Sequence, residues 1–464
     1  MLASVIFNYG AGYLMSWERR KDNAKCGRSP LICAIAGDLL LLAYFKYAGF
    51  FLDAANQMLG WGPNFGRILL PLGISFFTFT QIAFLVDVFQ GKAKELNFTH
   101  YLLFVTYFPH LIAGPILHHS QMMPQFAEQK TYRMDWANIS TGLTVFVIGF
   151  AKKVLIADYF STIATPIFSA AQNGNGPALI EAWTGALAYT LQLYFDFSGY
   201  SDMAIGLSLF FNVKIPLNFN SPYKAVNIIE FWRRWHMTLS AFLRDYLYIA
   251  LGGNRKGKER RYVNLFATMI LGGLWHGAGW TFVFWGALHG FYLIINHGFR
   301  AFCTRIGWRC GTFGRAGELA AAGITFLSVV IAWVFFRADS FATADIMLHG
   351  MAGSFGLRRA AIVQDGGAVV SRFFAASGIE GQLAVVVVFL GLAAVWSLPN
   401  TQEFMRFFDL NSEGENVTKP RGLAARLVWQ PDRWWTWSLV GILFALSILM
   451  ISPARVSEFL YYQF

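Results

Sequence analysis

Two histidines in apolar surroundings are the residues of this sequence best suited to proton-transfer chemistry. The first, His276, lies in Trp275-His276-Gly277-Ala278-Gly279-Trp280, inside an apolar run over residues 265–295. Imidazole changes charge nearest to neutral pH, and a titratable group in such a run usually faces a cavity or another helix. Gly273 and Gly277 are four residues apart, so another backbone can approach beside this histidine. On this segment alone, a general base and a buried structural histidine are equally good interpretations.

The second histidine, His236, lies where apolar and charged residues mix, in residues 231–251. That mixture predicts a re-entrant or interfacial segment rather than a lipid-facing span. Taken alone, His236 is also explained as an interfacial histidine beside arginines. Further candidates for lining a polar interior or for binding a substrate are Asp196, Tyr194, Tyr200, Asn218, Arg233, Arg234, Trp275, Asn254 and Arg255.

Membrane helices are the elements that must position these side chains. The chain has 464 residues, 56% of them hydrophobic and only 14% charged, whereas soluble domains carry roughly 25% charged residues. Together with many apolar runs of about 18 residues or more, this predicts an all-α, polytopic integral membrane protein. The net charge of +11 is interpreted as cytoplasmic loops that face anionic lipid, not as a nucleic-acid surface.

We expect about eleven transmembrane or re-entrant helices around a central polar tunnel. Residues 1–15 are interpreted as part of a membrane helix, not as a cleaved signal peptide. Residues 178–211 are too long for one crossing, so they form two pieces or one long tilted helix. Further spans are expected near residues 31–52, 68–89, 101–116, 142–160, 265–295, 319–336, 383–396 and 435–450. We expect a single domain over residues 1–464, with a motif core at 190–295 and extra helices at 340–464.

Several ordered sequence blocks carry a family resemblance. They are Tyr194-Phe195-Asp196-Phe197-Ser198-Gly199-Tyr200-Ser201-Asp202, Asn218-Phe219-Asn220-Ser221-Pro222-Tyr223, Phe231-Trp232-Arg233-Arg234-Trp235-His236, Leu251-Gly252-Gly253-Asn254-Arg255 and Gly272-Gly273-Leu274-Trp275-His276-Gly277. In these blocks the sequence resembles the membrane-bound O-acyltransferase family, in its alginate O-acetyltransferase branch, over residues 70–337. The last six residues, 459–464, resemble the usual ending of that branch. Relative to the family, we expect the N-terminus to be shorter by one membrane stretch.

The resemblance implies the chemistry and the partners. His276 matches the catalytic histidine of the family, and His236 matches its second active-site histidine. The implied reaction moves acetyl from cytosolic acetyl-CoA to an exopolysaccharide or to a periplasmic acetyltransferase partner, in the bacterial inner membrane. Transfer of D-alanine or another acyl group to a cell-wall polymer is the alternative within the superfamily.

The residues are consistent with that chemistry on physical grounds. Acyl transfer from a thioester to a hydroxyl needs a base and donors for the developing oxyanion. We expect His276 to be the base, while His236 orients the acceptor, polarises the carbonyl or relays the proton. Direct transfer is favoured because no serine lies in a nucleophile-elbow pattern and no cysteine is near either histidine. No bound cofactor is expected.

The remaining polar residues have simpler explanations. Arg233, Arg234 and Arg255 can bind CoA phosphates, but positive-inside bias explains each of them equally well. For Asp196 and Asp202 we favour a structural role. His289 cannot share a face with His276 on one straight helix, so we expect it to be structural or to contact another helix.

His110, His118 and His119 form the last group of histidines. No carboxylate or cysteine lies at ligand spacing from them, so we expect a loop that faces solvent or headgroups, and no metal site.

Two other classes of membrane protein also use carboxylates or histidines inside the bilayer. A proton-coupled transporter would use the same carboxylates and histidines as a relay, but no inverted repeat is found. A bis-histidine cytochrome would need a second histidine pair on a neighbouring helix.

Overall fold

The computed structural model describes residues 1–22, 28–59, 69–93, 95–111, 114–307, 314–357, 379–405 and 429–451. Every regular element in these ranges is helical, as predicted. The chain ending at residues 459–464 lies outside these ranges, as do residues 358–378 and 406–428 of the region expected to hold the extra C-terminal helices.

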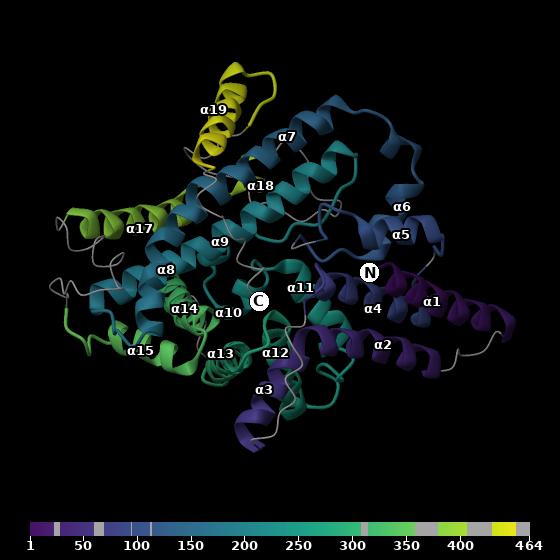
Figure 1. Cartoon of the computed structure of the whole chain (residues 1–464), viewed down its shortest axis with the longest axis horizontal. Helices are drawn as coiled ribbons and strands as arrows, with labels where there is room; N and C mark the ends of the chain where they lie inside the picture. The colour runs from purple at the N-terminus through teal and green to yellow at the C-terminus, as the bar shows by residue number, and fades with distance from the viewer. Residues whose placement is uncertain are drawn as a thin grey trace.

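The N-terminal helices pack around one apolar helix. This helix, α4 (Ile74–Gln90), contacts α1 (Leu2–Asp22) and α2 (Arg28–Leu42), which lie together at one end of the molecule (Figure 1). The chain continues from α2 through the π-helical turn η1 (Ala43–Tyr47) into α3 (Ala48–Leu59). The span expected near residues 101–116 is not one continuous helix, because α5 (Phe98–Thr106) ends within it and α6 (His119–Ala127) begins only after it. A short 3₁₀ helix, η2 (Gln129–Tyr132), follows.

Two long helical rods cross the middle of the molecule side by side (Figure 1). One is α7 (Trp136–Ala151), η3 (Lys152–Ala157) and α8 (Asp158–Gln172); the other is α9 (Leu179–Phe210). At 32 residues and 1.5 Å per residue, α9 is about 48 Å long, so the long-helix alternative is correct. The rods touch backbone to backbone: a Cβ on Gly149 would lie 2.5 Å from the carbonyl oxygen of Gly199.

Short helices separate the rods from the next long elements. They are η4 (Pro222–Lys224), α10 (Ile228–Trp232), α11 (Met237–Phe242) and the π-helical turn η5 (Leu243–Tyr248). This confirms that residues 231–251 do not form a continuous span. A hairpin of α12 (Lys258–His276) and α13 (Trp280–Arg305) follows. The remaining helices are α14 (Gly314–Arg337), α15 (Phe341–Met351), α17 (Ile379–Ser397), α18 (Thr401–Phe404) and α19 (Trp434–Met450).

The described residues include three helices long and apolar enough to cross a membrane: Arg28–Asn56, Trp136–Gln172 and Gly314–Arg337. Shorter apolar helices cover Ile74–Gln90, Gln382–Ser397 and Trp434–Met450. Large apolar side chains are exposed along the outer helices, as in Leu39 and Leu40 of α2 and Ile442 and Leu449 of α19. The chain is therefore a polytopic integral membrane protein, and the number of crossings stays a prediction.

The buried core holds a small aromatic cluster next to the candidate site. It combines Phe76 of α4, Leu239 and Phe242 of α11, and Trp275 of α12. Phe79 of α4 stacks on Trp275 with ring centroids 5.2 Å apart. The N-terminal helices and the α12–α13 hairpin are thus joined through this cluster.

Candidate active site

His276 ends helix α12, and the glycine that follows it lies against an aromatic ring of α13. The prediction of a single span over residues 265–295 is wrong, because α12 stops at His276 and α13 starts at Trp280. A Cβ on Gly277 would lie 2.2 Å from the ring of Phe282. The glycines beside the histidine therefore make a tight helical hairpin.

The two arms of the hairpin pack at backbone contact. A Cβ on Gly273 would lie 2.3 Å from the carbonyl oxygen of Phe282, and one on Gly286 would lie 2.3 Å from the carbonyl oxygen of Met269. The prediction of a close backbone approach at Gly273 is confirmed. Because the approach is so close, the hairpin holds the end of α12 in one position relative to α13.

Aromatic rings surround the His276 imidazole, which is 4% exposed. Its centroid lies 4.9 Å from that of Trp275, 5.2 Å from Trp285 and 5.3 Å from Phe336. Phe336 comes from α14, so three helices build the enclosure. Such apolar walls disfavour the charged imidazolium and keep the ring neutral, as a general base requires.

Two residues of η1, the turn between α2 and α3, donate hydrogen bonds to the carbonyl end of α12. The sequence analysis predicted a role for neither of them. Lys46 of η1 donates to the carbonyl oxygens of Trp275 at 2.5 Å and His276 at 3.4 Å. The hydroxyl of Tyr47 donates to the carbonyl oxygen of Leu274 at 2.8 Å. The last carbonyls of a helix lack partners within it, and a cation there also complements the helix dipole. The available signal was a lysine inside the apolar run 31–52, where charged residues are usually functional.

His236 is held in a rare backbone conformation directly before α11. Its φ of 43° and ψ of 54° are left-handed, a conformation that costs about 1–3 kcal/mol for a residue other than glycine. Backbone bonds from Met237 to Asn218 and from Asn220 to Arg234, of 3.0 and 2.9 Å, bind this segment to residues 218–220. The side chain is fully buried, edge-on to Phe197 at 4.7 Å.

The side chain of Asn218 determines which nitrogen of His236 carries the proton. Its Oδ1 accepts from the hydroxyl of Thr238 at 2.9 Å and from the Thr238 N–H at 3.4 Å, which identifies this atom as the oxygen. The same oxygen lies 3.0 Å from Nδ1 of His236. Nδ1 must therefore be the donor, so in the neutral ring Nε2 carries the lone pair.

The structure brings the two histidines together from segments forty residues apart. Their ring centroids are 6.3 Å apart, too far for one imidazole to hydrogen-bond to the other but close enough for a single atom between them to contact both. Trp275 contacts both rings. The arrangement can remove the proton of a hydroxyl group placed between the rings, with one imidazole as the base and the Nε2 lone pair of the other accepting or relaying a proton at the same oxygen.

The two predicted intramembrane carboxylates form ion pairs with lysines of η3. Asp196 pairs with Lys153 at 2.8 Å and Asp202 with Lys152 at 2.7 Å. Asp202 also accepts from Thr401 at 2.7 Å. These pairs join α9 to the other rod and to α18, which favours the structural role.

The remaining candidates lie at different depths. Tyr194 is buried against Tyr223, while Tyr200 packs at the edge of the cluster that contains Trp275. Arg234 pairs with Glu230 at 2.7 Å, whereas Arg233 is exposed.

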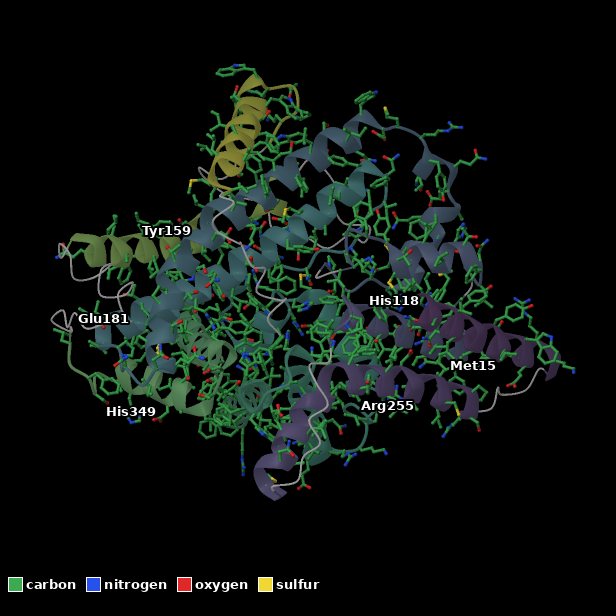
Figure 2. The ribbon with its side chains drawn as sticks, in the orientation of Figure 1. Met15, His118, Tyr159, Glu181, Arg255 and His349 are labelled. Atoms are coloured by element: carbon green, nitrogen blue, oxygen red, sulfur yellow. The ribbon has the colours of Figure 1, made fainter. Side chains whose placement is uncertain are left out.

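Asn254 and Arg255 belong to an exposed turn after η5. The Asn254 side chain accepts a hydrogen bond from Tyr248. Figure 2 shows Arg255 at the surface, on the side of the molecule from which α3 projects.

The structure corrects two interpretations of other histidines. His289 lies on the partner arm of a hairpin rather than on one straight helix with His276, and Trp285 contacts both imidazoles. His289 also contacts Trp232 of α10, so the expected contact with another helix is confirmed. The expected solvent-facing loop is wrong for His110 and His119, which are 1% and 4% exposed. A carboxylate does reach His118 and His119, because the fold brings Asp87 to them from α4.

Comparisons with known proteins agree on one family. The model of the membrane-bound O-acyltransferase family matches residues 74–310, which contain both site histidines. The peptidoglycan O-acetyltransferase of Helicobacter pylori is 43% identical over 384 residues, covering 77% of this chain and 70% of that protein. The probable alginate O-acetylase AlgI of Pseudomonas aeruginosa is 38% identical over 501 residues, covering 99% of this chain and 89% of that protein. The teichoic acid D-alanyltransferase of Streptococcus thermophilus is 30% identical over 234 residues, covering 48% of this chain.

Proposed function

This chain belongs to the membrane-bound O-acyltransferase family, and from that premise we propose that it moves acetyl from cytosolic acetyl-CoA to a polysaccharide hydroxyl outside the inner membrane. The observation that carries the proposal is the pair of buried imidazoles, His236 and His276, with ring centroids 6.3 Å apart. Both lie in the part of the chain that the family model matches.

In this mechanism His276 is the general base. Its neutral imidazole takes the proton of the acceptor hydroxyl while the hydroxyl oxygen attacks the thioester carbonyl carbon. The C–S bond then breaks, and the proton passes from the imidazolium to the departing CoA sulfur. His236, with its Nε2 lone pair directed by Asn218, holds or relays the proton at the acceptor oxygen. No acyl-enzyme is required.

The donor is proposed to enter from the cytoplasmic side. Arg233, directly after α10, and Arg255, in the turn after η5, are exposed, and neither forms an ion pair with another described residue. Arginine binds phosphate in a bidentate manner, and CoA carries several phosphates. A polar tunnel between this surface and the two histidines would let the thioester reach the base without crossing lipid.

The acceptor is proposed to be a sugar hydroxyl, or a hydroxyl of a periplasmic acetyltransferase that passes the acetyl group on. Acetylation is favoured over D-alanylation because the acetyltransferase relatives are 43% and 38% identical over 77% and 99% of the chain, against 30% and 25% identity over 48% and 64% for two D-alanyltransferases. The names of those relatives cover two glycan types, peptidoglycan and alginate. Both offer sugar hydroxyls to the same chemistry.

The test uses purified protein in detergent with acetyl-CoA that carries a labelled acetyl group. CoA release and label transfer to alginate, to peptidoglycan fragments or to a partner protein are followed for the wild type, His276→Ala and His236→Ala. We expect His276→Ala to abolish both signals and His236→Ala to reduce them severely, while His100→Ala, on a helix end away from the site, keeps them. Near-normal transfer by folded His276→Ala would overturn the assignment of the base. Transfer from a D-alanyl carrier but not from acetyl-CoA would overturn the donor.

A further inference from the structure

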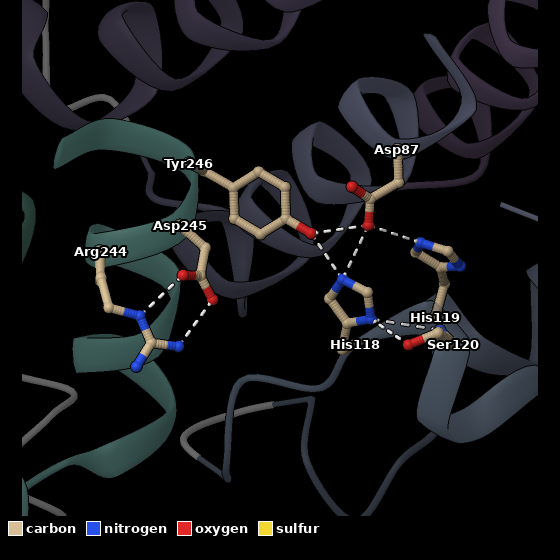
Figure 3. A network of polar contacts seen from close by, with 7 residues as sticks. All are labelled: Asp87, His118, His119, Ser120, Arg244, Asp245 and Tyr246. Atoms are coloured by element: carbon tan, nitrogen blue, oxygen red, sulfur yellow. Dashed lines mark hydrogen bonds and ion pairs between the residues drawn. The ribbon is translucent and has the colours of Figure 1, made fainter. Parts of the chain in front are cut away.

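Four ligand-type atoms converge at a point away from the two site histidines (Figure 3). Asp87 of α4 presents Oδ2 to Nε2 of His118 at 2.9 Å and to Nε2 of His119 at 3.0 Å. The hydroxyl of Tyr246, from η5, lies 2.8 Å from the same oxygen and 2.5 Å from Nε2 of His118. The three elements are far apart in sequence, so the fold creates this cluster.

We propose that Asp87, His118 and His119, with Tyr246 as a fourth ligand, form a binding site for a divalent transition-metal ion of the Zn²⁺ class. Two imidazoles and a carboxylate are the ligand set that Zn²⁺ and Fe²⁺ take in proteins. The imidazole and carboxylate ligand atoms all lie within 4.8 Å of one another.

The distances are compatible with an ion after a small expansion. Zinc–ligand bonds of about 2.0–2.2 Å in a tetrahedron place the ligand atoms about 3.4 Å apart. Four of the six separations among these atoms are 2.5–3.0 Å, so in those pairs each ligand must move outward by a few tenths of an ångström. His118 is the N-cap of α6 and His119 is its first residue.

The surroundings provide two further features of a metal site. A ligating histidine usually donates its other ring N–H to an acceptor, which fixes the tautomer. Nδ1 of His118 lies 2.6 Å from the hydroxyl oxygen of Ser120 and also accepts from the Ser120 N–H at 3.3 Å. With an ion on Nε2, Nδ1 would carry the proton and donate it to the hydroxyl, and the contact with the Ser120 N–H would be given up. The side chains of Asp87 and His119 are each 5% exposed, whereas that of His118 is 32% exposed. The site is thus shielded, with one ligand at its opening through which an ion can enter.

A metal here would position the segment that carries His236. Tyr246 is in η5, which continues α11, and α11 starts directly after His236. On the other side, the N–H of Ile116 donates to the hydroxyl of Thr238 at 2.9 Å, and Thr238 shares the oxygen of Asn218 with His236. The ion would therefore hold the η5 end of this segment against α4 and α6, while the bond from Ile116 holds its α11 end, so the ion would be structural rather than reacting.

The experiment measures metal content and does not depend on acyl transfer. Full-length protein, purified through a tag that does not bind metal and loaded with Zn²⁺, is analysed by elemental mass spectrometry after removal of free ion. We expect one tightly held Zn²⁺ per chain, and a loss of more than about a hundredfold in Zn²⁺ affinity in Asp87→Asn and His119→Gln. Loading with Co²⁺ should give the visible absorption of a tetrahedral site, and this absorption should shift in Tyr246→Phe.

Two variants serve as matched controls. Asp245→Asn removes a neighbouring exposed carboxylate that pairs with Arg244 (Figure 3), and His110→Gln removes a buried imidazole outside the cluster. Both should keep the ion. If Asp87→Asn fails to fold, His118→Gln at the opening tests the same ligand set. Wild-type protein that retains no Zn²⁺ or Co²⁺, or retention unchanged in His118→Gln and His119→Gln, would overturn the proposal.

Discussion

Replacing Asn218 tests whether its side-chain oxygen prepares His236 for chemistry. That oxygen accepts from Nδ1 of His236 at 3.0 Å and from the Thr238 hydroxyl at 2.9 Å. In Asn218→Ala the Nδ1–H keeps no acceptor in a fully buried site, or the proton moves to Nε2 and the lone pair is lost from the reacting side. Either outcome penalises the required tautomer.

The size of the effect follows from the cost of an unpaired buried donor. A buried N–H without a partner costs about 1–3 kcal/mol, which corresponds to a rate loss of about fivefold to 150-fold if the whole cost falls on the transition state. Asn218→Asp keeps an oxygen at the same position and should retain more activity than Asn218→Ala.

The assay is turnover of acetyl-CoA by protein that elutes as a single folded species. We expect the rate to fall from wild type to Asn218→Asp and further to Asn218→Ala. The KM for acetyl-CoA should change little, because the Asn218 side chain hydrogen-bonds to Ser201, His236 and Thr238 and not to the arginines proposed to bind CoA. A loss smaller than about threefold in Asn218→Ala, less than one unpaired donor should cost, would refute the tautomer reasoning. So would equal rates for the two variants.

Three further variants test how the site is held. Lys46→Met removes a charged donor from the Trp275 carbonyl and should destabilise the protein by about 1.5–3 kcal/mol, seen as a lower Tm, whereas Lys130→Met at an exposed pair should change little. Gly273→Ala places a Cβ 2.3 Å from a backbone oxygen and should lower both Tm and activity. Its control is Gly298→Ala on α13, where a Cβ meets open space and which should be neutral or slightly stabilising. Equal Tm values for the two variants would contradict the close approach. Asp202→Asn leaves the Lys152 ammonium without its carboxylate and should cost about 3–5 kcal/mol, and the double variant with Lys152→Met should recover part of that Tm; no recovery would mean that the pair itself contributes nothing.

Local sequence features predicted much of the fold and singled out the two histidines that the structure brings together. Apolar runs indicated membrane helices, the charged residues of 231–251 indicated a broken segment, and Gly273 indicated a close helix contact. Each of these signals lies within one segment and depends on residue type and spacing. They hold in the structure because the bilayer constrains every segment in the same way.

Contacts between distant segments could not be predicted in the same way. Asp87 comes within 3.0 Å of His119 although 32 residues separate them, so a search for ligand spacing along the chain misses it. The hairpin after His276 could not be predicted for another reason: Gly277 was interpreted, together with Gly273, as a packing residue within one helix, whereas α12 ends just before it.

The π-helical turns share a feature that hydropathy does not reveal. In the described residues, the π-helical turns η1, η3 and η5 each present a polar side chain to a partner in another element. These side chains are Lys46 in η1, Lys152 and Lys153 in η3, and Tyr246 in η5. An added residue in a helical turn rotates the side chains that follow. It can therefore turn a polar side chain of a largely apolar helix toward a partner in another element.

The contact of Lys46 and Tyr47 with the end of α12 also bears on how the protein is made. The partners are separated by 229 and 227 residues, which at about 5–20 residues per second take roughly ten to fifty seconds to synthesise. During that interval a lysine stands in an apolar rod before the carbonyl groups that will receive it have been translated. The early helices must therefore be sheltered by the insertion machinery, by lipid headgroups or by water, and the final closure of the site must wait for the ribosome to pass residue 276.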